Sequence, residues 1–222
     1  MAYRRTERVL QHLAARRDAI VAAARMIAGE QGLAAVQIAP VAERAGIAAG
    51  TVYRYFPAKS DLVEALIEAV SAREIAAFRK AADAAPGPLS ALAAGLVGFA
   101  ARALTHRRLA WAVSAEPVDA AVDDFRLAAR RALAAEIETR IRAAIAVGHL
   151  PEQDAGAAAL AVVGLMLEAL IGPLAPAADA GQARESVQTV TLLALRALGV
   201  VDARARGLVV QTTMPRPEED AA

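Results

Sequence analysis

The chain has 222 residues, and its 25 lysine and arginine side chains nearly balance its 24 aspartates and glutamates, which excludes a strongly basic or strongly acidic protein. The basic residues are nevertheless concentrated at one end, because residues 1–60 carry nine basic and four acidic side chains. The sequence contains no cysteine, which excludes disulfides, thiolate metal sites and a cysteine nucleophile.

The N-terminal segment MAYRRTERVL has charged residues where a signal peptide needs an apolar stretch. The longest charge-free helical runs, residues 88–101 and 155–167, fall short of the roughly 20 apolar residues that a membrane span needs. We therefore expect a cytoplasmic protein that has no membrane partner.

Apolar residues recur at intervals of three and four along the chain, and no stretch shows a sustained period of two. The 61 alanines also favour helix, because alanine loses no side-chain entropy there. The sequence therefore predicts an all-α fold, with Ser60 as the N-cap of the fourth helix and a flexible tail over residues 202–222, where the periodicity fades. About nine helices are expected, at residues 6–29, 38–45, 49–56, 60–83, 88–105, 107–114, 118–147, 152–171 and 182–198.

The most informative stretch is residues 37–59, QIAPVAERAGIAAGTVYRYFPAK, in which two very short helices are joined by a tight turn that contains Gly46. Such a pair is a helix-turn-helix pattern. The second helix has few apolar side chains for a core, namely Val52 and Phe56, and directs threonine, tyrosine and arginine to the other side. This pattern predicts a helix whose outer face contacts a partner.

The run VAERAGIAAGTVYRYFPAKSDL resembles the DNA-binding motif of the TetR/AcrR family of transcriptional regulators, and the resemblance covers residues 12 to about 70. It implies a three-helix helix-turn-helix DNA-binding domain over residues 1–59. A C-terminal helical domain for ligand binding and dimerisation would follow over residues 60–201. The implied function is a ligand-responsive repressor that a small molecule releases from a palindromic operator. The implied partners are double-stranded DNA, a largely apolar effector and a second copy of the chain, with no cofactor.

In such a domain the second short helix enters the major groove, where the base edges are fully distinguishable. Thr51 offers a hydroxyl and a methyl group to bases, and Arg54 can reach a guanine or a phosphate. The resemblance implies that Tyr53, Tyr55 and Lys59 contact backbone phosphates. The expected DNA-binding set is Gln37, Ala39, Ala48, Ala49, Gly50, Thr51, Tyr53, Arg54, Tyr55 and Lys59.

The sequence also departs from the family pattern. Gln37 stands where a threonine or serine usually caps the first short helix, and Ala39, Ala48 and Ala49 stand where serine or other polar or charged readers are usual. Specificity would then rest on thymine methyl groups or on DNA shape. A second interpretation stays open, that of a helical dimer that binds a ligand or a protein and has degraded DNA specificity.

An arginine-rich N-terminal segment allows two interpretations. It could be a basic arm that contacts phosphates or a minor groove, or it could be a solvated helix face. The residues concerned are Arg4, Arg5, Arg8, Arg16 and Arg17.

The C-terminal half has a few large apolar side chains that could line a ligand cavity or simply belong to the core. Glu168 is a lone acid between long uncharged stretches. If buried it would need a cationic partner such as Arg102 or Arg196, and otherwise it would be exposed or at an interface. The expected ligand-binding set is Phe99, His106, Trp111, Phe125, Met166 and Glu168.

The last two expected helices, at 152–171 and 182–198, carry alanine, leucine and valine on more than one side. A monomer would expose this apolar surface, and a symmetric four-helix bundle with a second copy would cover it. We therefore expect a homodimer. An enzyme and a metal site are not expected, because the sequence has no P-loop, HExxH or GxSxG motif and its three histidines are scattered.

Overall fold

The computed structural model describes residues 2–118, 120–173, 175 and 180–212 of the chain. These residues form helices without a strand, which confirms the predicted all-α class. The elements in chain order are α1 (Ala2–Gln31), the 3-10 helix η1 (Leu33–Ala35), α2 (Ile38–Arg44), α3 (Ala49–Tyr55), α4 (Lys59–Asp83), α5 (Pro88–Thr105), α6 (Arg107–Ser114), the 3-10 helix η2 (Ala120–Val122), α7 (Asp123–Ala146), α8 (Ala155–Ile171), α9 (Ala180–Ala197) and α10 (Asp202–Gln211).

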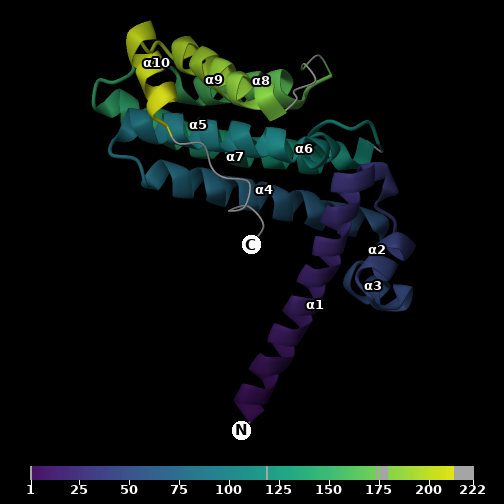
Figure 1. Cartoon of the computed structure of the whole chain (residues 1–222). Coiled ribbons are helices and arrows are strands. Elements are labelled where there is room, and N and C mark those ends of the chain that lie inside the picture. The colour runs from purple at the N-terminus through teal and green to yellow at the C-terminus, as the bar shows by residue number, and fades with distance from the viewer. Residues whose placement is uncertain (1, 119, 174, 176–179, 213–222) are drawn as a thin grey trace.

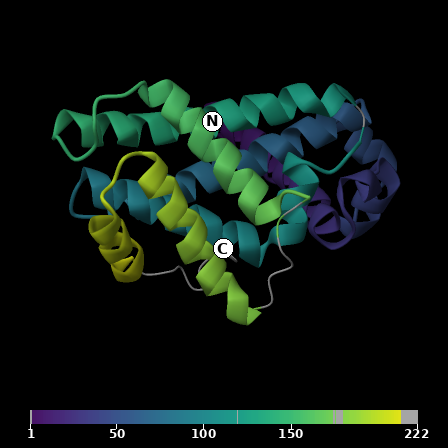
Figure 2. The ribbon, with the colours of Figure 1, turned by 90° about the horizontal axis from the view of Figure 1, so that it is seen from above.

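The helices form two apolar clusters, which we call the head and the body. The head consists of α1, α2, α3 and the first half of α4, and Ala112 and Val113 of α6 and Val122 of η2 are buried in the same cluster. The body consists of the second half of α4 with α5, α7, α8, α9 and α10. Helix α1 extends beyond the other head helices and away from the body, while α8, α9 and α10 lie on the far side of the body (Figure 1). Seen from above, α8 and α9 form the outermost layer (Figure 2).

Helix α4 belongs to both clusters. Leu62 and Leu66 near its start are fully buried in the head, and Phe78 and Ala82 near its end are buried in the body. Its first turn differs from the expected one, because the N-cap is Ala58 and Ser60 lies inside the helix. The Asp61 carboxylate accepts a hydrogen bond from the Ala58 backbone N–H at 2.9 Å.

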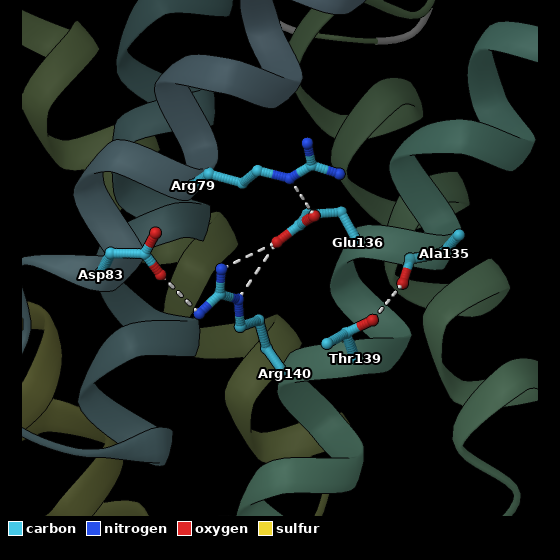
Figure 3. Close-up of polar contacts among 6 residues, drawn as sticks. All are labelled: Arg79, Asp83, Ala135, Glu136, Thr139 and Arg140. Carbon is cyan, nitrogen blue, oxygen red and sulfur yellow. Dashed lines mark hydrogen bonds and ion pairs between the residues drawn. The ribbon is translucent and has the colours of Figure 1, made fainter.

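A charged network joins α4 to α7 on the outer side of the body (Figure 3). Its centre is Glu136, whose side chain is 6% exposed and which accepts hydrogen bonds from Arg79 and Arg140. Arg140 also contacts Asp83 at 2.8 Å. A nearly buried carboxylate with two guanidinium partners holds α7 firmly against α4, because loss of either partner would leave the charge poorly compensated.

Helix α5 runs through the middle of the body and is almost entirely buried. Among the described residues it is the one helix that is long and apolar enough to cross a membrane, and 72% of that apolar window is buried inside the fold. Its apolar character is thus used in protein packing. It approaches α4 closely at Gly95, where a Cβ atom would collide with the fully buried ring of Phe78.

The predicted tail is wrong over its first ten residues. Residues Asp202 to Gln211 form α10, because Ala205 and Val209 lie one turn apart and both pack into the body core. Arg206 also donates to the Asp202 carboxylate at 2.9 Å. Residues 213–222 of the expected tail lie outside the described residues.

We expect Gly95→Ala to destabilise the protein by about 1–3 kcal/mol, because the new methyl group would overpack a core in which the Phe78 ring has no room to move. Urea unfolding followed by circular dichroism measures the change. Gly207→Ala in α10 is the matched control, since a Cβ there meets no atom within 4 Å. The control should be neutral or gain up to about 1 kcal/mol. Equal stability of the two variants would contradict the close packing of α4 on α5.

Candidate nucleic-acid interface and ligand cavity

The helix-turn-helix is held by a small apolar core and a glycine turn. Val41 of α2 and Val52 of α3 are both fully buried where the two helices cross. Gly46 has φ +67°, a left-handed conformation that glycine adopts without a steric penalty. The Ile47 N–H donates to the Ala42 carbonyl at 3.0 Å and closes the turn. The orientation of α3 is therefore fixed by backbone geometry and packing together.

Helix α3 presents its polar side outward. Tyr53 is 53% exposed and Arg54 is also exposed, whereas Val52 and Phe56 are buried in the head. Thr51 is half-buried, so its hydroxyl is not enclosed in the core. The structure thus divides α3 as expected, with Val52 on the core side and Tyr53 and Arg54 on the outer side.

The remaining residues of the expected DNA-binding set lie around the ends of the same short helices. Gln37 precedes α2 without capping it, and its side-chain amide donates instead to the Ala34 carbonyl at 2.9 Å. Lys59 is exposed at the start of α4, directly after α3. A Cβ added at Gly50 would meet no atom of the described residues within 4 Å, so none of them covers this turn of α3. Ala39 and Ala48 are exposed, and Ala49 and Tyr55 are half-buried.

Helix α1 braces the other two head helices. Arg44 of α2 makes a two-pronged contact with Glu30 of α1 at 2.7 and 2.8 Å, and this contact lowers the pKa of Glu30. The Arg17 guanidinium lies 5.3 Å from the centre of the Phe56 ring. Of the arginines considered for a basic arm, Arg17 thus contacts α3, and Arg16 is exposed.

A cavity of about 110 Å³ lies in the body close to the head. Its walls come from α4, α5, α6, α7 and α8, and Arg25 of α1 also reaches it. The apolar part of the wall includes Phe99, Leu109, Leu133 and Ile171. This site is enclosed by several helices and largely apolar, as binding sites for small molecules usually are.

Two of the six residues expected to bind a ligand, Phe99 and His106, line this cavity. Phe125 lines a neighbouring hollow between α4 and α7, which shares Ile67 and Ala129 with the cavity. Three of the six residues expected to bind a ligand thus lie at this cavity or at the hollow beside it.

The structure does not bring Trp111, Met166 and Glu168 to the cavity. Trp111 is half-buried on α6 and does not line the cavity. Met166 is 1% exposed and packs in the body core. Glu168 is exposed on α8, and Arg102, which we had considered as its partner, binds Glu74 at 2.9 Å instead.

Sequence reasoning missed the charged part of the cavity wall. It includes Arg25, Arg102 and Arg126, of which Arg102 is 6% and Arg126 is 8% exposed. The available signal was Arg102, which is the single charged residue of the otherwise apolar helix α5. Across the described residues no group of three or more histidine, aspartate or glutamate side chains could hold a metal ion.

Arg126 connects the cavity wall to the end of α6. It donates to the backbone carbonyls of Val113 at 3.1 Å, Ala112 at 3.0 Å and Glu116 at 2.7 Å. A cation is favourable at this position, because the last carbonyls of a helix lack partners within it. Burial lowers the pKa of the Arg126 guanidinium, and the charge of Asp123 opposes this shift.

The segment after α6 in turn contacts the head, at a junction centred on Gly32. The Glu116 carboxylate accepts the Leu33 backbone N–H at 3.0 Å, and Arg108 donates to the Gln31 carbonyl at 2.8 Å. Gly32 has φ +94°, and a Cβ there would lie 2.5–2.7 Å from the Arg108 and Glu116 side chains. The head is thus joined to α6, a wall of the cavity, as well as to α4.

Comparison with known proteins gives matches to both parts of the chain. The family model "Bacterial regulatory proteins, tetR family" matches residues 20–66, which contain α2 and α3. The HTH-type transcriptional repressor KstR of Mycolicibacterium smegmatis is 52% identical over 48 residues, and KstR of Rhodococcus jostii is 50% identical over 48 residues. These matches cover 22% of this chain and 24% and 23% of the relatives, so the similarity spans about a quarter of their length.

Solved structures resemble the whole chain. RolR in complex with resorcinol has a TM-score of 0.69 at 23% identity, covering 93% of this chain and 98% of RolR. GusR of Salmonella enterica has a TM-score of 0.66 at 24% identity, covering 83% of this chain and 95% of GusR. At these identities the likeness shows the fold. Residues 20–66, which contain the helix-turn-helix, therefore match the tetR family of bacterial regulatory proteins in sequence, and the whole chain shares the fold of these solved structures.

Proposed function

We propose that this protein is a ligand-responsive transcriptional repressor, a homodimer that binds a palindromic operator and releases it when a small molecule occupies the body cavity. The observation that carries the proposal is the outer side of α3. In the segment that matches the family model, α3 has its apolar residues buried and leaves Tyr53 and Arg54 exposed.

The proposed DNA contact divides the residues of α3 and its neighbours into two roles. Thr51 and Arg54 face the base edges in the major groove, which is wide enough to admit a helix. Tyr53 and Lys59 contact backbone phosphates and set the position of the helix on the duplex. The exposed Ala39 and Ala48 contribute no polar readers, so apolar contacts to thymine and DNA shape supply the rest of the specificity.

The proposed dimer forms through the outermost helices of the body. Exposed residues on α8 recur at helical spacing, as Ala157, Leu160, Ala161 and Gly164, and Leu160 is 58% exposed. Leu193 on the adjacent α9 is 50% exposed. This stripe of small and apolar residues allows close approach of a second copy, and a twofold axis there would pair two heads for two halves of an operator.

The proposed release rests on the position of the cavity between the body and the head. Helix α6 forms one wall of the cavity, and its C-terminal segment holds the end of α1 through Glu116. Helix α4 forms another wall and enters the head core. A ligand releases DNA only if it binds the arrangement that does not fit DNA more tightly than the arrangement that does. The contact of α6 with α1 and the packing of α4 in the head therefore have to differ between the two arrangements.

The cavity of about 110 Å³ has room for a small group, since about 150 Å³ accepts benzene in a well-studied protein. It adjoins the hollow of about 390 Å³ between α4 and α7. The structural neighbour RolR holds resorcinol, which is a single-ring molecule. We therefore propose an effector of about one ring.

Removal of a phosphate contact and removal of a base contact should have different effects on DNA binding. We expect Lys59→Ala to weaken binding to the operator and to unrelated DNA alike, and to reduce the slope of log K against log salt by about one. Thr51→Val, in contrast, should weaken binding to the operator more than to unrelated DNA. Fluorescence anisotropy on fragments selected from genomic DNA measures both effects.

Lys80→Ala is the matched control for the phosphate contact, because Lys80 is an equally exposed lysine on the same helix, in the part that belongs to the body. The control should leave DNA affinity and salt dependence unchanged. If Lys59→Ala matches the control, and the parent binds selected and unrelated fragments equally, the alternative of degraded DNA specificity is favoured.

We expect Leu160→Arg to convert the dimer to a monomer, because a desolvated guanidinium at the centre of the α8 stripe would have no partner. Size-exclusion chromatography with light scattering measures the mass. Val147→Arg, at an apolar residue that is 53% exposed at the end of α7, is the control and should remain dimeric. A dimeric Leu160→Arg variant would place the interface elsewhere.

A further inference from the structure

The charged side chains around the body cavity are predominantly basic. One glutamate and five arginines contribute to the wall, namely Glu74, Arg25, Arg73, Arg102, Arg126 and Arg130. Glu74 is already paired with Arg102 at 2.9 Å. Even with Arg73 left out of the count, Arg25, Arg126 and Arg130 give the largely apolar lining a surplus of positive charge.

Two of the cavity-lining arginines, Arg126 and Arg130, lie on α7, and both donate hydrogen bonds to backbone carbonyls. Arg126 donates to three carbonyls at the end of α6, and its nearest counter-ion, Asp123, lies at 3.5 Å with a side chain that is 72% exposed. Arg130 donates to the Ser114 carbonyl at 2.9 Å. Backbone carbonyls satisfy hydrogen bonds but do not neutralise a charge, so the positive potential of this wall persists.

Arg25 differs from Arg102, Arg126 and Arg130 in its hydrogen bonding. It is half-buried, and within the described part of the chain it makes neither a hydrogen bond nor an ion pair. Its side of α1 faces α6, because at Gly29, one turn further along, a Cβ would lie 3.8 Å from the Cβ of the wall residue Leu109. Arg25 is thus a cation at the cavity wall with no counter-ion among the described residues, and an anionic group of a ligand would supply one.

We infer that the effector is a compact organic carboxylate whose apolar body occupies the cavity and whose carboxylate pairs with Arg25. A guanidinium matches the planar geometry of a carboxylate and can donate two parallel hydrogen bonds to it. The apolar wall beside it, with Phe99, Leu133 and Ile171, suits a single ring. This inference rests on the proposed function of the cavity as the effector site.

The position of Arg25 also gives the carboxylate a direct connection to the head. Arg25 lies on α1, two turns before the junction at Gly32 where Glu116 and Arg108 hold the end of this helix. A ligand that pairs with Arg25 while its ring is held by α5 and α7 joins body and head through one more bond. Its binding therefore favours one arrangement of α1 relative to the body.

Benzoate and benzamide test the inference, because the two molecules have nearly the same size and differ in charge. Isothermal titration calorimetry on the full chain, at constant ionic strength, measures their affinities. We expect benzoate to bind clearly more tightly than benzamide. Arg25→Gln should weaken benzoate about tenfold or more and leave benzamide unchanged, since a hydrogen-bonded charge pair contributes about 1.5–3 kcal/mol.

Arg16→Gln is the matched control, because it removes the same charge from the same helix at an exposed position. It should bind benzoate like the parent. Arg25→Lys retains the positive charge and should bind benzoate with intermediate affinity. Thermal melts of all variants check that they are folded.

Equal affinities for benzoate and benzamide would overturn the inference, and so would undiminished benzoate binding by a folded Arg25→Gln variant or no binding of either ring. Operator binding by the ligand-free parent is measured in parallel. If it persists while benzoate fails to bind, the carboxylate inference fails and the proposed repressor stands. If the parent binds no operator, the proposed function fails independently of the cavity result.

Discussion

The structure depends on the simultaneous burial of α4 in two apolar clusters. Leu62 and Leu66 are buried in the head and Phe78 is buried in the body, so the two parts share one continuous helix. The contact of the Phe78 ring with Gly95 and the network around Glu136 hold the second half of α4 against α5 and α7. A change in the packing of the body therefore reaches the head through a stiff element and not through a flexible linker.

The junction at Gly32 is a second connection, and it has a different physical character. Beside the burial of Ala112 and Val113 of α6 in the head core, the Leu33 N–H donates to Glu116, Arg108 donates to the Gln31 carbonyl, and a left-handed glycine leaves room for both side chains. Packed cores resist small displacements, whereas hydrogen bonds at a half-exposed junction can exchange with water at a modest cost.

The basic residues of the N-terminal third illustrate how tertiary structure changes the meaning of a charge pattern. The excess of positive charge in residues 1–60 favours a DNA-binding surface. Within it, however, Arg44 pairs with Glu30, Arg17 lies over the Phe56 ring, and Arg25 reaches the body cavity. Part of the charge stabilises the head or lines a ligand site, so the outer side of α3 depends on fewer cations than the sequence suggests.

The sequence by itself determined most of the helices and which side of α3 faces the core. The reason is that periodicity, glycines and prolines act over a few neighbouring residues. Val52 and Phe56, for example, are one turn apart, and Gly46 lies in the turn directly after α2. Helix α10 was missed because it needs the body core to receive Ala205 and Val209. The cavity could not be predicted for the same reason: Arg25, Arg102 and Arg126 meet from three helices far apart in the chain. The tertiary structure alone decided that meeting, because which charges share an enclosure depends on packing between distant helices and not on any local pattern.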